Sequence, residues 1–212
     1  MNFRKTLALS LLAPAFMAAG AFALSTPRHN HAVTLLPDGN ILVTGGNTAE
    51  NTYLATAEMY DMTTNAWSVW GGGLGIARSS HTATLMSDGR VLVAGGFTTG
   101  GTPTGDLRIC DPRDRTCAYA GVDMAARGGH TATLLSAGPR SGHVLLCGGQ
   151  TTVSSASITT ACETFDPVAG ALSPAASMIS SRIGHVALLL RSGKVFVSGG
   201  GRPGGPGTEP WI

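Results

Sequence analysis

The sequence is poor in charge and in aromatic rings: charged residues make up 12% and aromatic residues 6% of its 212 residues. Beyond residue 23, basic and acidic residues nearly balance, and Lys194 is the only lysine left. Nucleic-acid binding needs clustered lysine and arginine to displace counterions from phosphate, so this composition argues against it. No stretch after residue 23 is apolar for long enough to cross a bilayer, so we expect no membrane span after that point.

Residues 1–23 differ from the rest of the chain. Arg4 and Lys5 precede an apolar stretch that closes on Ala21-Phe22-Ala23. This is the three-part pattern of a secretory signal peptide. An uncleaved membrane anchor is the alternative, because the apolar run is almost long enough to span a bilayer. The small residues at its end favour cleavage after Ala23, which predicts a secreted or periplasmic protein.

The remaining sequence repeats one unit four times, and each copy contains an arginine, a histidine, an apolar segment, a turn glycine and a glycine pair. The arginines and histidines are Arg28 and His31, Arg78 and His81, Arg127 and His130, and Arg182 and His185. The glycine pairs are Gly45 and Gly46, Gly95 and Gly96, Gly148 and Gly149, and Gly199 and Gly200. Each pair begins six residues after the turn glycine, so we expect a second strand of one fixed length.

The turn between the first two strands has a hairpin composition. Asp38-Gly39 and Asp88-Gly89 suit tight turns, because glycine accepts the positive φ that such turns require. The third copy has four extra residues, which we place in the hairpin tip at 137–140, where insertions cost least. Each unit therefore begins with a β-hairpin.

A second hairpin follows in the first three copies. Tyr60, Cys110 and Phe165 are each followed by an aspartate, and the residues seven positions after them are Trp67, Cys117 and Leu172. A unit is therefore four antiparallel strands in about 50 residues. The second strand is apolar on both faces, which is typical of sheets stacked face to face around an axis. The predicted fold class is all-β, a β-propeller of about three and a half blades at 28–77, 78–126, 127–181 and 182–200, followed by a Gly/Pro-rich tail at 201–212.

This order of residues resembles the kelch repeat, in the secreted variety that also forms the propeller of galactose oxidase. The resemblance covers residues 28–200 and implies an incomplete ring, because kelch propellers usually close with roughly six or seven blades. An open arc leaves two apolar blade faces in water, which predicts self-association, a separately supplied remainder or a truncated product of a longer gene. A closed four-bladed ring would require Leu24–Pro27 or the tail to add strand to the last blade.

The repeated arginine and histidine side chains have two interpretations. A ring of four imidazoles could hold a metal, but a residue that recurs once per blade usually serves the packing of that blade. We interpret them as structural, with Glu58 and Glu163 as partners of the arginines, although the matching place in the second copy holds Arg108. No helix signal follows the glycine pairs, so they do not form a phosphate-binding loop. The sequence therefore predicts no metal and no cofactor.

The cysteines depart from the repeat. Cys110 and Cys117 replace the aromatic residues of the first copy, and Cys147 and Cys162 fall on adjacent predicted strands. In an oxidising compartment, two local disulfides would each add about 2–3 kcal/mol of stability. A zinc site is disfavoured, because no C-x-x-C pair occurs. Four buried free thiols remain the alternative.

The segments that join the second to the third strands differ between copies. They are residues 47–56, 97–106 and 150–160, rich in Thr, Ser, Asn and Gln. Loops on a rigid scaffold often carry binding residues, so we expect a face that binds a protein or a glycan, with Tyr53, Phe97 and Asp106 as candidate contacts. For any single loop, a solvated segment without a ligand is the alternative.

The competing function is a fragment of a carbohydrate-active enzyme, either a galactose oxidase-like copper radical oxidase or a sugar epimerase. The oxidase resemblance implies a tyrosine next to a histidine, which this sequence lacks. The variable segments contain few carboxylates, Glu50 and Asp106, which disfavours paired acid and base catalysis. The prediction is a non-enzymatic binding scaffold.

Overall fold

The computed structural model describes residues 24–49, 52–154 and 157–201. The predicted signal peptide at 1–23, Glu50 and residues 202–212 of the predicted tail lie outside the described residues. In the described ranges, no helix is long and apolar enough to cross a membrane.

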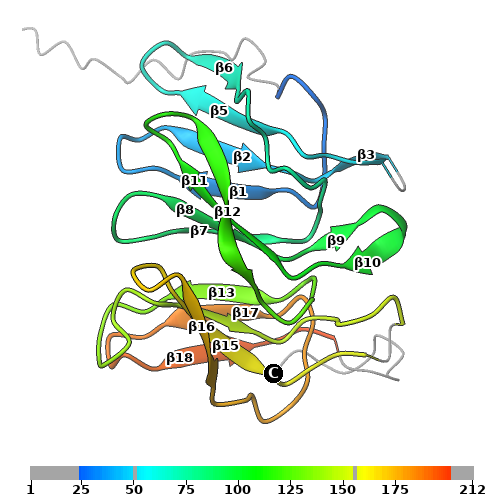
Figure 1. Cartoon of the computed structure of the whole chain (residues 1–212), viewed down its shortest axis with the longest axis vertical. Helices are drawn as coiled ribbons and strands as arrows, with labels where there is room; N and C mark the ends of the chain where they lie inside the picture. Colours follow the sequence, from blue (N-terminus) through cyan, green and yellow to red (C-terminus); the bar gives the residue numbers. More distant parts are fainter. Residues whose placement is uncertain (1–23, 50–51, 155–156, 202–212) are drawn as a thin grey trace, which may run out of the picture.

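Four antiparallel sheets follow one another along the chain (Figure 1). The first contains β1 (Ala32–Leu35), β2 (Ile41–Thr44), β5 (Ala57–Asp61) and β6 (Ala66–Val69). The second contains β7 (Thr82–Leu85), β8 (Val91–Ala94), β11 (Asp106–Asp111) and β12 (Thr116–Asp123). The third contains β13 (Thr131–Leu134), β14 (Val144–Cys147), β15 (Cys162–Asp166) and β16 (Ala171–Ala175), and the fourth contains β17 (Val186–Leu189) and β18 (Val195–Ser198).

The prediction of an all-β partial propeller is confirmed by this arrangement. Each of the first three sheets has its strands in chain order, and the fourth has two strands in the described part of the chain. Tyr60 lies opposite Trp67, Cys110 opposite Cys117 and Phe165 opposite Leu172 in the third and fourth strands. The spacing of seven residues therefore located the second hairpin in each copy, because a hairpin of fixed length fixes its register.

Small hairpins extend the connection between the second and third strands. β3 (Asn47–Ala49) pairs with β4 (Thr52–Tyr53), and β9 (Phe97–Thr98) pairs with β10 (Thr102–Pro103) around the short 3-10 turn η1 (Thr99–Gly101). These hairpins lie at one edge of the stack, and the turns between β1 and β2 and between β5 and β6 lie at the opposite edge (Figure 1).

The core lies between neighbouring sheets. Leu42 of β2 and Trp70, which directly follows β6, pack with Val91 and Val93 of the second sheet. On the other side of β8, Leu92 packs in a second cluster that continues into the third sheet. All four residues of β8 are therefore fully buried, which explains why the second strand of the repeat is apolar on both faces.

Both ends of the stack present apolar side chains to solvent. On β1, Val33 and Leu35 are 58% and 66% exposed, whereas their counterparts Ala83 and Leu85 pack against the first sheet. On the last sheet, the exposed side chains are Val186, Leu188 and Phe196. The described part of the propeller is thus an open arc with two uncovered blade faces.

Candidate functional site

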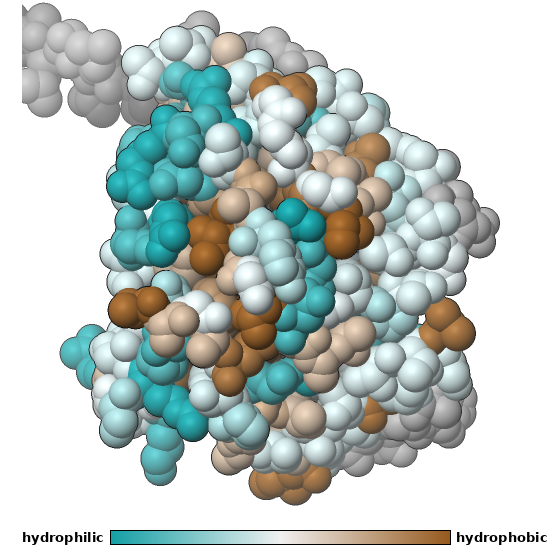
Figure 2. All heavy atoms as spheres, viewed as in Figure 1, coloured by the Kyte–Doolittle hydropathy of each residue, from teal (hydrophilic) through white to brown (hydrophobic). Residues whose placement is uncertain are grey.

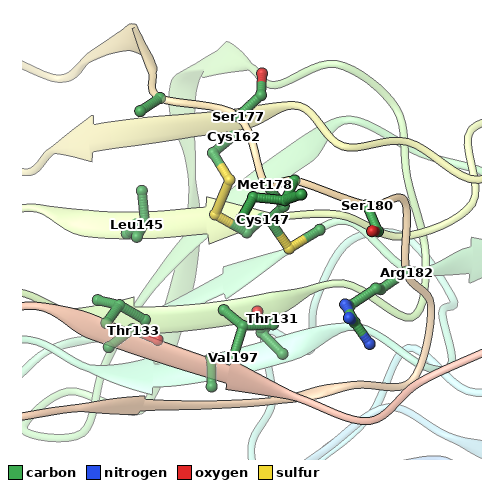
Figure 3. Close-up of a pocket in the computed structure, with 14 residues that line it drawn as sticks. Thr131, Thr133, Leu145, Cys147, Cys162, Ser177, Met178, Ser180, Arg182 and Val197 are labelled. Carbon is green, nitrogen blue, oxygen red and sulfur yellow. A yellow bond between two sulfur atoms is a disulfide. The ribbon is translucent and has the colours of Figure 1, made fainter.

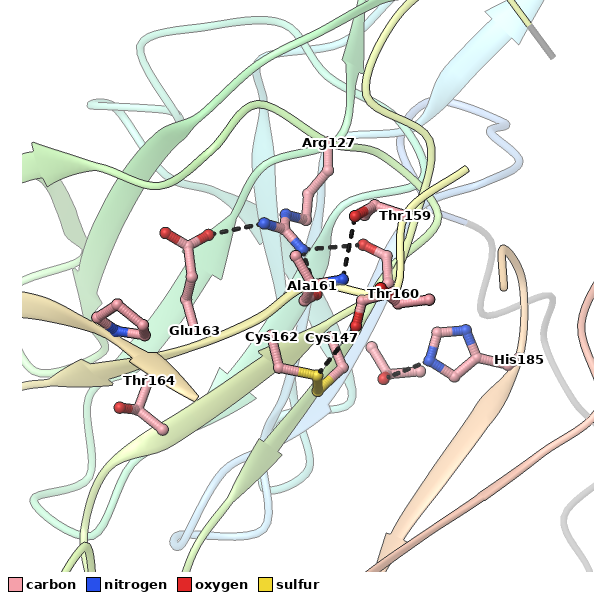
Figure 4. The surroundings of a disulfide bond; sticks show 12 residues. Arg127, Cys147, Thr159, Thr160, Ala161, Cys162, Glu163, Thr164 and His185 are labelled. Carbon is pink, nitrogen blue, oxygen red and sulfur yellow. Dashed lines mark hydrogen bonds and ion pairs between the residues drawn. A yellow bond between two sulfur atoms is a disulfide. The ribbon is translucent and has the colours of Figure 1, made fainter. Parts of the chain in front are cut away.

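The repeated arginines bind within their own blades, and Arg78 and Arg127 are fully buried. The Arg127 guanidinium donates to the carbonyls of Gly148 and Ala161, at 3.2 and 2.8 Å, and to Glu163 Oε2 at 2.7 Å (Figure 4). Burial lowers the pKa of Arg127, and the Glu163 carboxylate opposes that shift. The arginine therefore ties the second strand to the third strand of the blade.

Arg28 makes the same connection in the first blade. Its guanidinium donates to the Gly45 carbonyl at 3.0 Å and forms a buried ion pair with Glu58. Glu58 and Glu163 hold the place that the sequence suggested for them, at equivalent positions of β5 and β15.

In the second blade, the carboxylate comes from a different position. Arg78 forms a buried ion pair with Asp106, and Arg108 pairs with the other oxygen of the same carboxylate at 2.8 Å. The prediction of Asp106 as a binding-loop contact is wrong, because its side chain is buried between two cations. Arg108 in the place of a glutamate was the signal that another anion had to lie nearby.

The repeated histidines join one blade to the next. His81 Nε2 lies 2.8 Å from the Thr44 hydroxyl, and His130 Nε2 lies 3.0 Å from the Thr82 hydroxyl. Burial, followed by the charge of the neighbouring arginine, lowers the pKa of His81 and of His130 to about 3. These imidazoles are therefore neutral at physiological pH. Among the residues that the structure describes, no three His, Cys, Asp or Glu side chains cluster as metal ligands.

The glycine pairs lie where the blades approach each other most closely. Gly96 has φ +100°, and a Cβ there would lie 2.8 Å from the Cβ of His81. Its N–H donates to the Arg127 carbonyl of the next blade at 2.9 Å. A Cβ on Gly95 would lie 2.5 Å from that same carbonyl oxygen. Side chains are excluded here by the neighbouring backbone.

Two disulfides join neighbouring strands, and the described residues contain no free cysteine. Cys110–Cys117 takes the position of the contact between Tyr60 and Trp67, whose ring centroids lie 5.2 Å apart. Cys147–Cys162 links β14 to β15 beside the Arg127 side chain (Figure 4). Structural disulfides are typical of an oxidising compartment.

The candidate binding surface is the edge that carries the variable segments, which we call the loop face: residues 47–49 and 52–56, 97–105, and 150–154 with 157–160. These described residues include no charged side chain. Figure 2 shows this edge in pale colours of intermediate hydropathy, whereas strongly hydrophilic residues gather toward the opposite edge.

The two aromatic candidates differ in their surroundings. The Phe97 ring lies against the next blade, since a Cβ added to Gly128 would lie 2.6 Å from a ring carbon. Phe97 therefore serves blade packing. Tyr53 is partly exposed on β4 of the loop face. Tyr53 therefore stays a candidate contact.

A ladder of main-chain hydrogen bonds crosses the blades at this edge. Ser80 N–H donates to Asn30 O at 2.8 Å, Gly129 N–H to Ser80 O at 2.9 Å, and Gly184 N–H to Gly129 O at 2.9 Å. All four residues have positive φ, which glycine and asparagine tolerate best. This ladder was not predicted, although Asn30, Ser80, Gly129 and Gly184, which precede the repeated histidines, are residues that favour or tolerate positive φ.

The third variable segment holds its own shape. Thr151 Oγ1 donates to Ser157 O at 2.9 Å, Thr152 Oγ1 to Ser157 Oγ at 2.7 Å, and Gln150 Nε2 to Thr152 O at 2.8 Å. These bonds join described residues of one segment to each other. Internal hydrogen bonds thus hold the described residues of the loop face in place.

Comparison with known proteins agrees with the fold. The sequence model of the protein family described as "Kelch motif" matches residues 27–69. A solved structure described as "Structure of YjhT" superposes with a TM-score of 0.63 at 17% sequence identity, over 76% of this chain and 56% of that one. Residues 27–69 therefore match the kelch motif, and the described chain has the fold of a partial β-propeller. It spans little more than half of the length of the YjhT structure, and no curated protein sequence matches it.

Proposed function

We propose that this kelch-repeat protein is an extracytoplasmic binding scaffold whose loop face takes a neutral polar ligand, a glycan in the first place. The observation that supports this most is the composition of the loop face, whose described residues carry hydroxyl and amide side chains and the partly exposed Tyr53 ring but no charged group. Kelch propellers generally act by binding, and the blade stack supplies the rigid support that such a surface needs.

The chemistry of the loop face favours carbohydrate. Sugar hydroxyls exchange hydrogen bonds with neutral hydroxyl and amide groups, and a tyrosine ring offers an apolar body with a polar tip. Thr48, Thr52 and Thr99 are exposed there and can donate or accept. A protein surface with the same neutral polar character is the other ligand compatible with this face.

Two independent features support the extracytoplasmic location. The disulfides Cys110–Cys117 and Cys147–Cys162 fit an oxidising compartment, and residues 1–23 have the pattern of a secretory signal peptide. The proposal includes no catalytic step, because the repeated arginine and histidine side chains already serve the packing of the blades.

An array of neutral and acidic oligosaccharides tests the proposal. We expect the purified chain to bind neutral oligosaccharides, and Tyr53→Ala to weaken that binding by about tenfold or more. Met62→Ala is the matched control, since Met62 is an exposed apolar side chain in the turn at the opposite edge, and binding should stay unchanged. Binding that resists Tyr53→Ala and falls with Met62→Ala would place the ligand elsewhere and refute the loop face.

A further inference from the structure

A cavity of about 360 Å³ lies between the third sheet and the fourth. Leu145, Cys147 and Cys162 line it from the third sheet, and Val195 and Val197 line it from β18. Figure 3 shows Arg182 at one end of this cavity and Leu145 toward the other. The lining is mostly apolar, with the arginine as its cationic group.

The other blade junctions are filled at this place by the third strand of the following blade. Cys110 of β11 packs in the core beside Val91 and Val93, the counterparts of Val195 and Val197. Phe165 of β15 fills the next junction in the same way. In the described residues, the fourth sheet has only β17 and β18. The cavity therefore lies at the position that a side chain of the third strand fills at the other two junctions.

Arg182 also lacks the third-strand partner that its three counterparts have. Arg28, Arg78 and Arg127 each form an ion pair with a carboxylate of the third strand. Arg182 donates to the Gly199 carbonyl at 2.6 Å, but no carboxylate among the described residues forms an ion pair with it. A third strand for the fourth sheet should thus carry an acidic residue at the matching position.

The chain itself contains such a sequence. In the first and third blades, the carboxylate precedes an aromatic residue by two positions, as Glu58 precedes Tyr60 and Glu163 precedes Phe165. Residues 208–212 read TEPWI, which places Glu209 two positions before Trp211. Only that stretch of the chain beyond β18 contains both a carboxylate and an aromatic ring.

We propose that residues 208–212 dock along the outer edge of β18 as the third strand of the fourth sheet, with Trp211 in the cavity and Glu209 paired with Arg182. The connection would be residues 199–207, compared with 45–56 in the first blade. This connection is shorter, yet it exceeds the roughly two to five residues that an antiparallel hairpin needs.

The register of the first blade decides where each residue of this strand lies. Glu58 pairs with Val43 and Tyr60 pairs with Ile41. By the same alignment, Glu209 lies opposite Val197, near the Arg182 end of the cavity. Trp211 lies opposite Val195, two residues before Val197 on β18.

Proline at position 210 is compatible with this register. Gly45 N–H donates to Thr56 O, and Trp70 N–H donates to Ala57 O, so alternate residues of the third strand bond to β2 and to β6. Met59, the counterpart of Pro210, therefore directs its N–H toward the fourth strand. The described fourth sheet has no fourth strand, so a proline there forfeits no ladder bond.

Amide hydrogen exchange on the full chain tests the proposal, with NMR to resolve residues 207–212. The amides of Glu209 and Trp211 should exchange at least about tenfold more slowly than in the Trp211→Ala or Glu209→Gln variants. Both substitutions lie in the tail, so neither removes a contact described within the blades. Exchange at the rate of an unstructured peptide in the unmodified chain would overturn the docking.

Arg182 is tested in the same way. Arg182→Gln should abolish the slow exchange at Glu209, whereas Arg191→Gln, which removes an exposed cation in the turn between β17 and β18, should leave it unchanged. Slow exchange that survives both Glu209→Gln and Arg182→Gln would contradict the ion pair. Protection that appears only as the protein concentration rises would assign the groove to a second copy and overturn docking within one chain.

Discussion

His81 of the second blade lies 2.8 Å, measured from Nε2 to Oγ1, from the hydroxyl of Thr44 in the first blade. Thr44 lies on β2, whereas Thr82, which performs the same task for His130, lies on β7, the first strand of its blade. The cross-strand pairs Ala32 with Thr44 and Thr82 with Ala94 explain the difference. In each pair one residue is threonine and the other alanine, but the threonine is on the second strand in the first blade and on the first strand in the second blade. Because the two positions lie opposite each other, the hydroxyl reaches the histidine of the next blade from either strand.

Replacing Thr44 should weaken the junction between the first two blades. Thr44→Val keeps the shape of the side chain but leaves a buried imidazole nitrogen without its partner, and should lower the free energy of unfolding by about 1–3 kcal/mol. Thr44→Ser retains the hydroxyl and should lose less. Urea denaturation measures both variants, and equal stability of Thr44→Val and the unmodified protein would contradict a structural role of this contact.

Stability should fall as the pH is lowered from about 6.5 toward about 3. Burial lowers the pKa of His81 and His130 to about 3 in the folded protein, so the unfolded chain binds more protons in this range. Each histidine should contribute a slope of about 1.4 kcal/mol per pH unit. Thermal denaturation between pH 7 and pH 4 should show a shallower slope for His130→Gln. A slope identical to that of the unmodified protein would mean that His130 does not titrate in this way.

Asp106 should be required for folding stability. Asp106→Asn leaves Arg78 and Arg108 without their shared carboxylate, and loss of one partner from a buried pair costs roughly 3–5 kcal/mol. Asp123→Asn, in which the altered residue is exposed on β12, is the control and should change stability far less. Denaturant midpoints compare the two variants. Similar midpoints for both would contradict a stabilising role of the Asp106 carboxylate.

The two disulfides should contribute unequally. They close loops with sequence separations of 7 and 15 residues, and the longer loop restricts the unfolded chain more. Removing Cys147–Cys162 by double alanine substitution should therefore cost about 0.5–1 kcal/mol more than removing Cys110–Cys117. Denaturation without reductant measures the difference, and the opposite ranking would indicate that packing rather than loop closure dominates.

The blades were predictable because the same residues recur at the same spacing in four copies of the repeat. The turn glycines and the glycine pairs located the first hairpin of each blade, and the spacing between Tyr60 and Trp67 located the second, because turn residues act locally along the chain. Asp106 was misassigned because its role depends on Arg78, which the chain brings near it only after the sheet forms. The packing of Phe97 on Gly128 and the ladder through Ser80 are also contacts between blades, and these depend on tertiary distances that no local pattern encodes.

The proposed binding role is tested most directly by locating a bound ligand on the surface. Amide hydrogen exchange should be compared with and without the neutral oligosaccharide that binds best on the array. The bound ligand should slow exchange in the loop-face residues 47–49, 52–56, 97–105, 150–154 and 157–160, and should leave the turns at 36–40 and 61–66 unchanged. Slower exchange confined to those turns, or to the exposed blade faces around Val33 and Leu188, would contradict it.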